Sequence, residues 1–250
     1  MTIIRPLALV TGGMRRLGAV IAAKLADAGY DVAISTHDPA HLDPSLQGQG
    51  DSNRHGFIAD LSHPGAAEKL LRAVTAHFGR TPDLLVNNAA MFGQDQWPEM
   101  SLDTLEAHFR LNVFAPLLLS RALVEAAGPQ QQPAIIHILD QRIAHPHGDQ
   151  ISYTLSKQAL AASVRSMASA FGARARINGV APGLVMATDD YDAALEQRLA
   201  GMMPLGALPA PAGVADAVHY LAGAVHVTGQ IIFVDGGANL KNFERDFMHL

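Results

Sequence analysis

The sequence contains no cysteine, and this absence excludes several kinds of chemistry. A chain without thiols has no disulfide scaffold, thiol nucleophile, iron–sulfur cluster or cysteine-based zinc site. Charged residues are sparse as well, at 16%, and 23 acidic residues outnumber 18 basic ones, which gives a formal charge of −5. A net acidic chain is a poor non-specific ligand for nucleic acid or for an anionic membrane.

Long apolar runs are also missing. No segment reaches the roughly 20 apolar residues that a membrane helix needs. Residues Met1–Pro6 lack a long apolar run and a cleavage site, so we expect no signal peptide. We therefore expect a cytoplasmic protein with neither membrane nor nucleic acid among its partners. The histidines leave a metal site formally open, but His137, His145 and His147 lack a matching ligand set, so no metal is expected.

Short β-rich runs alternate with longer helical stretches along the whole chain, 49% of which is hydrophobic. The expected strands are Leu7–Val10, Asp31–Ser35, His55–Ile58, Leu84–Val86, Ala134–Leu139, Arg176–Val180 and Gln230–Val234. The expected helices are Arg16–Ala28, Gly65–Phe78, Ser101–Ala127, Ser152–Phe171 and Gly213–Ala222. This order predicts an α/β fold of single-domain Rossmann type, a doubly wound parallel sheet of about seven strands with helices on both faces. We expect one domain over residues 1–250, with residues 184–211 as a substrate lid.

A glycine-rich turn follows the first expected strand and leads into the first expected helix. It reads Thr11-Gly12-Gly13-Met14-Arg15-Arg16-Leu17-Gly18. Glycines let the backbone approach a pyrophosphate, and a helix N-terminus attracts it through free N–H groups and the helix dipole. Guanidinium groups suit phosphate as well. The turn predicts a dinucleotide site, with an ordinary strand–helix turn and a solvated Arg15 as the alternatives.

The end of the second expected strand indicates which dinucleotide binds. An acidic side chain there would bind the ribose 2′-hydroxyl of NAD and repel a 2′-phosphate. This chain instead has Thr36 followed by His37. Together with Arg15 and Arg16, these residues favour NADPH as the cofactor. Asp38 disagrees with that prediction unless its side chain points away.

Tyr153 and Lys157 lie four residues apart in an expected helix, which places both side chains on one helical face. A phenol has a pKa of about 10, and a nearby ammonium group favours its phenolate form. The pair is therefore typical of an acid–base site. Because this spacing is common by itself, the alternative is that Tyr153 and Lys157 are an ordinary pair on the surface.

Seven features in the correct order make the chain resemble the short-chain dehydrogenase/reductase family over essentially its whole length. They are the Thr11–Gly18 turn, Asp60, Asn87–Ala90, Asn112, the Tyr153/Lys157 pair, Pro182-Gly183 and Asp235–Gly237. The resemblance implies Tyr153 as proton donor, Lys157 as ribose ligand and modulator of the tyrosine pKa, and Asn112 on a water-mediated proton relay. With the turn and strand-end residues above, it gives these cofactor contacts: Gly12, Arg15, Arg16, Leu17, Gly18, Thr36, His37, Asp60, Leu61, Asn88, Ala89, Ala90, Tyr153, Lys157, Pro182, Gly183 and Leu184.

Two departures from the family pattern narrow the expected substrate. The family's catalytic Ser would lie 13 residues before Tyr153, where this chain has Asp140, and Arg16 replaces a glycine. A carboxylate repels the oxyanion that develops on a carbonyl substrate, but it suits a basic heterocycle whose ring nitrogen needs a proton. Both departures resemble the pteridine reductase branch, as does Phe92 at the place of the aromatic ring that stacks on the pterin. Ala90, where that branch commonly has Ser, leaves the exact pterin open.

These observations predict an NADPH-dependent reductase of a pterin of dihydropterin, dihydromonapterin or dihydrofolate type. The expected catalytic residues are Asp140, Tyr153, Lys157 and Asn112, and the expected substrate contacts are Arg16, Phe92, Asp140 and Tyr153. A carbonyl or 3-oxoacyl reductase of the same family is the main alternative, and a non-catalytic NADPH-binding sensor is another. The resemblance also implies a homotetramer, with the helices over Ser101–Ala127 and Ser152–Phe171 between subunits. The Lys241–Leu250 tail has no assigned role.

Overall fold

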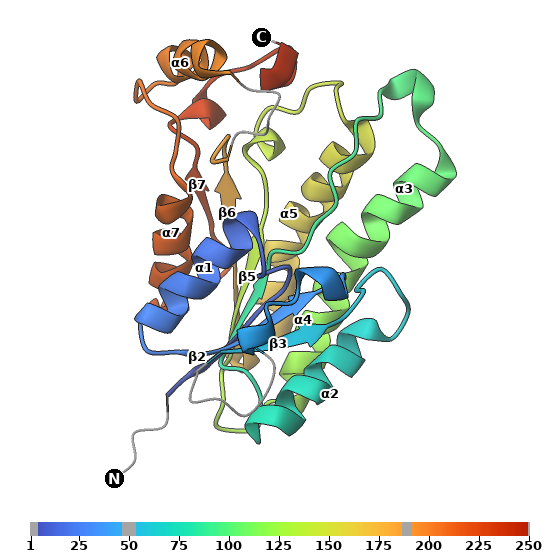
Figure 1. Ribbon diagram of the computed structural model, residues 1–250, viewed down its shortest axis with the longest axis vertical. Coiled ribbons are helices and arrows are strands. Elements are labelled where there is room, and N and C mark those ends of the chain that lie inside the picture. Colours follow the sequence, from blue (N-terminus) through green and yellow to red (C-terminus); the bar gives the residue numbers. More distant parts are fainter. Residues whose placement is uncertain (1–4, 47–53, 187–191, 250) are drawn as a thin grey trace.

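Seven parallel strands form one sheet in the order β3-β2-β1-β4-β5-β6-β7 (Figure 1). Their bounds are β1 Leu7–Val10, β2 Asp31–Thr36, β3 Arg54–Ile58, β4 Leu84–Asn87, β5 Ala134–Ile138, β6 Arg176–Pro182 and β7 Ile231–Val234. The computed structural model describes residues 5–46, 54–186 and 192–249. Every residue of β1, β4, β5 and β6 is buried, as expected of parallel strands covered on both faces. The predicted fold class is confirmed.

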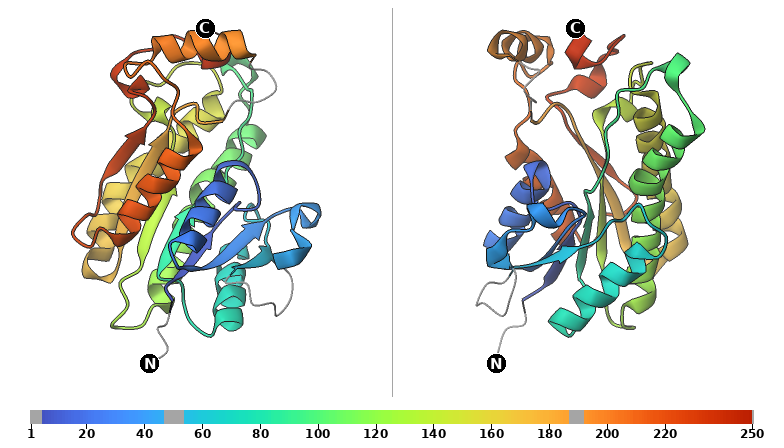
Figure 2. Two further views of the ribbon diagram at one scale, coloured as in Figure 1. Left: turned by 60° about the vertical axis from the view of Figure 1, so that its left-hand side comes forward. Right: turned by 45° about the vertical axis from the view of Figure 1, so that its right-hand side comes forward.

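Helices cover both faces of this sheet (Figure 2). Their bounds are α1 Arg16–Asp27, α2 Ala66–Phe78, α3 Leu102–Phe109, α4 Ala115–Ala126, α5 Ile151–Phe171, α6 Ala193–Met202 and α7 Pro211–Gly223. On one face, α1 and α7 bury residues such as Leu25 and Val218 against the sheet. On the other face, α2, α4 and α5 bury a second apolar cluster that includes Val74 and Leu119. Among the residues described, no helix is both long and apolar enough to cross a membrane.

The strand order reverses between β1 and β4, and this reversal positions the site. Chain segments leaving β1 and β4 turn to opposite faces of the sheet, so a crevice opens beyond their carboxyl ends. The peptide N–H of Thr11, at the end of β1, donates to the carbonyl oxygen of Val86 in β4 (3.0 Å). The glycine-rich turn therefore begins at the mouth of this crevice.

The single helix expected over Ser101–Ala127 was wrong in one respect, because a π-helical turn at Arg110–Phe114 separates α3 from α4. Pro116 lies in the first turn of α4 and has no N–H to donate. A proline ring also clashes with the carbonyl four residues earlier, and the wider π turn relieves that clash.

The segment over 184–211, expected only as a lid, contains α6. The Asp192 carboxylate accepts a hydrogen bond from the N–H of Leu195 (2.7 Å) and caps this helix. Leu199 of α6 packs with Phe243 and Phe247 of the C-terminal tail, so α6 and the tail lie together at one end of the molecule (Figures 1 and 2). Residues 187–191, which include Asp189, Asp190 and Tyr191, lie outside the described residues.

Candidate active site

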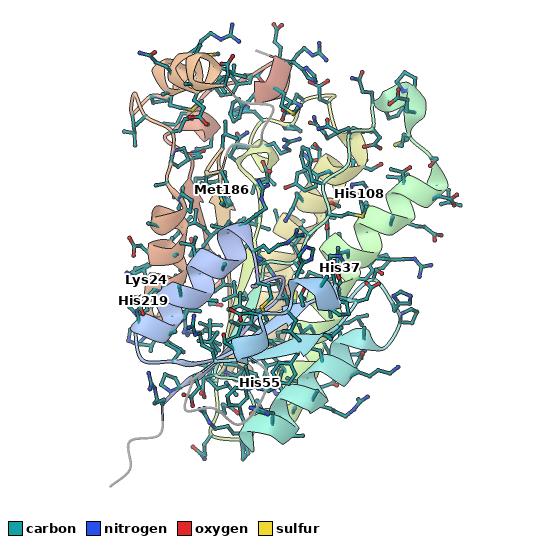
Figure 3. The ribbon with its side chains drawn as sticks, viewed as in Figure 1. Lys24, His37, His55, His108, Met186 and His219 are labelled. Carbon is teal, nitrogen blue, oxygen red and sulfur yellow. The ribbon has the colours of Figure 1, made fainter. Side chains whose placement is uncertain are left out.

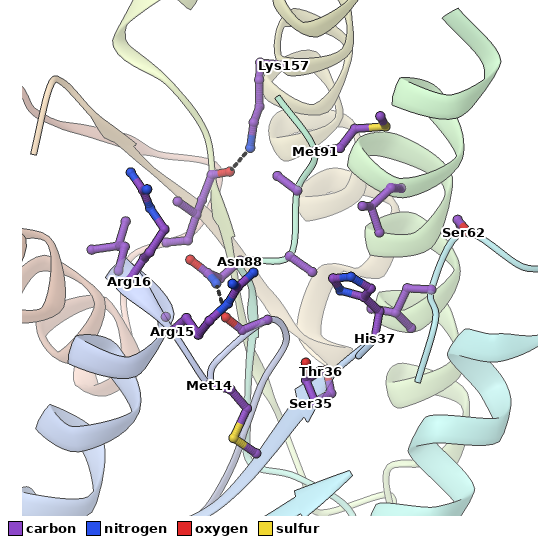
Figure 4. A pocket seen from close by; sticks show the side chains of 18 of the residues that line it. Met14, Arg15, Arg16, Ser35, Thr36, His37, Ser62, Asn88, Met91 and Lys157 are labelled. Atoms are coloured by element: carbon purple, nitrogen blue, oxygen red, sulfur yellow. Dashed lines mark hydrogen bonds between the residues drawn. The ribbon is translucent and has the colours of Figure 1, made fainter. Parts of the chain in front are cut away.

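Two adjoining cavities occupy the crevice. The main cleft, of about 760 Å³, is lined by the glycine-rich turn, the ends of β2 and β4, the segment after β3, and α5 (Figure 4). The side pocket, of about 510 Å³, is lined chiefly by Phe92, Arg142, Met186 and residues 246–248. Every residue predicted as a cofactor contact lines the main cleft except Leu184, which lines the side pocket. All four predicted substrate contacts line the side pocket.

The glycine-rich turn is closely packed against the segment after β4. A Cβ atom on Gly18 would lie 2.3 Å from the carbonyl oxygen of Gly12 and 2.6 Å from Nδ2 of Asn88. Gly12 itself has a φ of +62°, in the left-handed region. The Asn88 amide donates to the carbonyl oxygens of Thr11 (2.9 Å) and Gly12 (3.1 Å), so this side chain braces the turn (Figure 4). The sequence predicted Asn88 as a cofactor contact and gave no sign of this bracing.

Arg16 has a left-handed backbone, with a φ of +50°, at the position where the family pattern has glycine. A non-glycine residue in this region costs about 1–2 kcal/mol. The guanidinium group extends across the crevice and donates from Nη2 to the carbonyl oxygen of Met186 (3.4 Å). Arg16 lines both the main cleft and the side pocket, so one side chain reaches both sites despite its strained backbone.

The discordant Asp38 does point away from the cleft. Its carboxylate accepts a hydrogen bond from the N–H of Ala40 (2.8 Å) and pairs with Nδ1 of His41 (3.0 Å). Both partners of the Asp38 carboxylate therefore belong to the loop that follows β2. Arg15 Nη1 lies 2.9 Å from Nε2 of His41, and His37 lines the cleft nearby. At the end of β2, the main cleft is therefore lined by the guanidinium group of Arg15 and the imidazole ring of His37.

The tyrosine and the aspartate meet between the two cavities. The Tyr153 hydroxyl donates to Oδ2 of Asp140 at 2.9 Å. Phe92 meets the Tyr153 ring edge-on, with centroids 4.8 Å apart. Phe92 is 49% exposed, so it is a wall of the side pocket and not part of the core. A buried phenol that shares a hydrogen bond with a partly buried carboxylate can hand a proton to a bound molecule.

The ionisation of Tyr153 differs from the sequence expectation. Lys157 was expected to lower the tyrosine pKa, but burial and the Asp140 carboxylate raise the Tyr153 pKa well above 10.0, against a smaller lowering by Arg142. The Lys157 ammonium donates to the carbonyl oxygen of Ile138 (2.7 Å) and lies 5.7 Å from the centre of the tyrosine ring. Tyr153 therefore keeps its proton at neutral pH.

Lys157 is the buried cation of the main cleft. Desolvation lowers the pKa of Lys157 to about 8, although the Asp140 carboxylate opposes that shift. His137, buried behind it, has its pKa lowered to about 3 by burial and by Lys157. The histidine is therefore neutral at pH 7, and the lysine ammonium is held at a cost in folding free energy.

That cost gives a stability prediction. The difference between a Lys157 pKa of about 8 and the ordinary value of 10.5 corresponds to a destabilisation of the folded state of about 3 kcal/mol. This destabilisation is fully present below pH 8 and is lost as the pH rises toward 10.5. Lys157→Met is therefore expected to raise the free energy of unfolding at pH 7 by up to that amount, and by little at pH 10, while impairing cofactor binding. Urea titrations at both pH values measure this. The control is Lys24→Met. Lys24 lies on α1 (Figure 3), its exposed side chain pairs with Asp216 of α7, and its loss should change stability little at either pH. An equal gain for Lys157→Met at both pH values would contradict the prediction.

Asn112 lies in the π-helical turn and is buried. Its Nδ2 donates to the carbonyl oxygen of Met91 (3.0 Å) and to Oγ of Ser156 (3.0 Å), and its Oδ1 accepts from the N–H of Met91 (2.9 Å). The side chain thus ties the segment after β4 to α5, and Asn112 is not among the residues that line the two cavities. Its part in a proton relay stays a prediction.

Sequence reasoning missed two further residues of the site, Arg142 and Asp246. Arg142 follows Asp140 by two residues, yet nothing in a short loop signals that its side chain is buried. Asp246 lies 104 residues further along the chain and reaches Arg142 only through the fold. The unassigned C-terminal tail is thus part of the side pocket.

The fold and the site together define a dinucleotide-binding oxidoreductase. The chain belongs to the short-chain dehydrogenase/reductase family, since the family model described as "Enoyl-(Acyl carrier protein) reductase" matches residues 13–239.

Similar proteins of two kinds are known. A putative ketoacyl reductase 2 of the granaticin polyketide synthase from Streptomyces violaceoruber is 29% identical, over 94% of this chain and 96% of that protein. The dihydromonapterin reductase of Enterobacter sp. (strain 638) is also 29% identical, over 95% and 98%. The crystal structure of FolM alternative dihydrofolate reductase 1 from Brucella canis, complexed with NADP, has a TM-score of 0.82 and 30% identity, and covers 96% of each chain. The similarity to a dihydromonapterin reductase and to a FolM structure therefore confirms the resemblance to the pteridine reductase branch.

Proposed function

We propose that this protein is an NADPH-dependent reductase of pterins, of the dihydropterin, dihydromonapterin or dihydrofolate type. The observation that carries the proposal is the 2.9 Å hydrogen bond from the Tyr153 hydroxyl to Asp140, which stands where the general family pattern has a Ser. This pair opens onto a side pocket walled by Phe92 and Arg16. A flat heteroaromatic ring fits such a wall, and its basic nitrogen suits such a pair.

The main cleft fits a dinucleotide. The cradle between Gly12 and Gly18 admits no Cβ atom at Gly18, and it lies at the N-terminus of α1, whose N–H groups have no side-chain cap. Arg15 and His37 would hold the 2′-phosphate, and Lys157 would hold a ribose. Relatives of the pterin type with NADP bound support the same cofactor here.

Proton transfer is the task of the chain's own residues. When bound, NADPH supplies a hydride to an electrophilic carbon of the pterin ring. The Tyr153/Asp140 pair carries one proton between its oxygens, and the tyrosine hydroxyl gives that proton to the neighbouring ring nitrogen. Because the Tyr153 pKa is raised, the proton is present at neutral pH when it is needed.

Positioning of the pterin falls to other groups. Arg16 and Phe92 would hold the ring between the two cavities. We also propose that residues 184–211 act as a lid. Leu184 and Met186, at its beginning, already line the side pocket, and Met186 accepts from Arg16.

A substrate panel tests the proposal. The purified protein should oxidise NADPH, and NADH much less, when given dihydromonapterin, dihydrobiopterin or dihydrofolate, followed by the loss of absorbance of the reduced nicotinamide. The second candidate is a carbonyl or 3-oxoacyl reductase, which the similarity to a ketoacyl reductase favours. Turnover of 3-oxoacyl esters or ketones with none of any pterin would establish that candidate instead.

We further propose a homotetramer. Phe114 and Leu118 of the α4 region and Leu155 of α5 are 49%, 37% and 37% exposed in the isolated chain, and apolar side chains on long helices are typical of an interface. Light scattering should give four times the mass of one chain, and Phe114→Glu should lower it. A monomeric wild-type protein at micromolar concentration would contradict this proposal.

A further inference from the structure

All three guanidinium nitrogens of Arg142 donate hydrogen bonds to side chains around the site. Its Nε donates to Oδ1 of Asp140 (3.2 Å), its Nη1 to Oε1 of Gln150 (3.0 Å) and Oγ1 of Thr154 (3.3 Å), and its Nη2 to Oδ2 of Asp246 (2.8 Å). The side chain is 6% exposed. Each nitrogen of the guanidinium group therefore has a fixed acceptor, and these acceptors come from three separate parts of the chain.

These contacts fix the rotation of the Asp140 carboxylate. Oδ1 accepts from both the backbone N–H and Nε of Arg142, at 2.9 Å and 3.2 Å, which leaves Oδ2 to accept from the Tyr153 hydroxyl. The guanidinium carbon lies 5.2 Å from the centre of the Tyr153 ring and 5.7 Å from that of Phe92. A planar fork held at several points defines a direction that a single point charge does not.

The C-terminal tail holds Arg142 from the other side. Asp246 is buried, and its own position is fixed because its N–H donates to Asp149 (2.9 Å) and its Oδ1 accepts from the N–H of Met248 (3.0 Å). Phe247, the next residue, packs in the apolar cluster under α6. Gln150, the acceptor in the middle, has a left-handed backbone with a φ of +48°. Strained residues of this kind persist where the surroundings fix them, and they cluster at functional sites.

We propose that Arg142 is a positioning residue of the reaction, and that Asp246 acts through it by locking the guanidinium group that orients Asp140 toward Tyr153. The C-terminal tail is then a working part of the site and not only its wall. This inference rests on the proposed function, because it assigns the Asp140/Tyr153 pair the transfer of the substrate proton.

A double-mutant cycle between Arg142→Met and Asp246→Asn tests the proposal. Each single variant is expected to lower kcat for dihydromonapterin about 10- to 100-fold, the effect of a small misplacement of a catalytic group. The KM for the pterin and the Kd for NADPH should change less than about threefold. Because Asp246 acts through Arg142, adding Asp246→Asn to the Arg142→Met variant should lower kcat no further. Multiplying effects would show that Asp246 acts on its own and would overturn the proposal.

A matched control comes from the same tail. Arg245 pairs with Asp149 at 3.0 Å, but its side chain is 51% exposed and touches neither Asp140 nor Arg142 in any contact described. Arg245→Gln is expected to leave kcat within about twofold. An equal loss for Arg245→Gln and Asp246→Asn would mean that the tail acts only as an anchor, which contradicts the proposal.

If Arg142→Met or Asp246→Asn unfolds the protein because the buried Arg142–Asp246 pair is lost, Arg142→Lys provides a second test. A lysine keeps the charge but cannot span Asp140 and Asp246 together, so kcat should fall about tenfold in a protein of normal circular dichroism. An Arg142→Lys enzyme with normal kcat would overturn the proposal. The outcome is separable from that of the proposed function: a wild type that reduces ketones and no pterin rejects the function, and the cycle is then measured with the ketone.

Discussion

Tyr153→Phe is expected to lower kcat for pterin reduction about 1,000-fold or more, with the Kd for NADPH within about twofold of the wild-type value. Phenylalanine keeps the ring, and with it the contacts to Phe92, Arg142 and Lys157. It removes only the hydroxyl that donates to Asp140. The loss should therefore fall on proton transfer, and stopped-flow and steady-state rates with a saturating pterin measure it.

The control for this variant is Tyr220→Phe. Tyr220 lies on α7 and is 59% exposed, so the same atom is removed at a place remote from the cleft, and kcat should not change. Pterin reduction by Tyr153→Phe at more than a tenth of the wild-type rate would show that another group supplies the proton.

The pH dependence of wild-type activity gives an independent check on the ionisation of Tyr153. Burial raises the Tyr153 pKa well above 10.0, and burial lowers that of Lys157 to about 8. The first alkaline decline of activity should therefore come from deprotonation of Lys157, through weaker cofactor binding, and not from loss of the tyrosine proton. This decline should appear in kcat/KM for NADPH near pH 8.

The fold could be predicted from the sequence because local patterns and parallel pairing agree in this chain. The run Leu7–Val10 is apolar throughout and is followed by a glycine-rich turn. Such a segment is typical of a strand in the middle of a parallel sheet, where both faces are buried. Where the prediction erred, the cause was local as well. Pro116 introduces a π turn into an otherwise uniform helical pattern. The apolar residues Leu195, Leu199 and Met202 of α6 do follow helical spacing, but the proline-rich residues 204–211 that come next favoured a loop for the whole segment.

The candidate site was predictable only where its residues lie on motifs. Gly12, Tyr153 and Lys157 occupy spacings that their chemistry demands, and the structure brings them to one cleft. Arg142 and Asp246 follow no spacing, because their contact depends on how the tail folds back beneath α6. The direction of the Tyr153 pKa was also beyond the sequence, since it depends on burial and on the Asp140 contact.

Asp140→Ser is expected to exchange one specificity for another. Pterin kcat/KM should fall about 1,000-fold, a loss of about 4 kcal/mol in transition-state stabilisation, because the ring nitrogen loses the carboxylate that helps to protonate it. Turnover of a 3-oxoacyl ester or a ketone should rise at least about tenfold, since a neutral hydroxyl can donate to a carbonyl oxygen where a carboxylate repels the developing oxyanion. Rates with both substrates, at saturating NADPH, give the ratio directly.

Asp140→Asn separates the charge of this residue from its position. The amide oxygen of asparagine can still accept from Arg142, as Oδ1 of Asp140 does, but the group facing Tyr153 becomes an N–H donor. If the carboxylate charge is what the pterin needs, Asn and Ser should both lose pterin turnover, and the Asn variant should keep wild-type stability. If Asp140 served only to hold Arg142, the Asn variant would retain most of its pterin activity. Efficient ketone reduction by the wild type, unchanged by Asp140→Ser, would instead place this chain with the carbonyl reductases of its family, because a carboxylate beside the tyrosine would then present no barrier to an oxyanion.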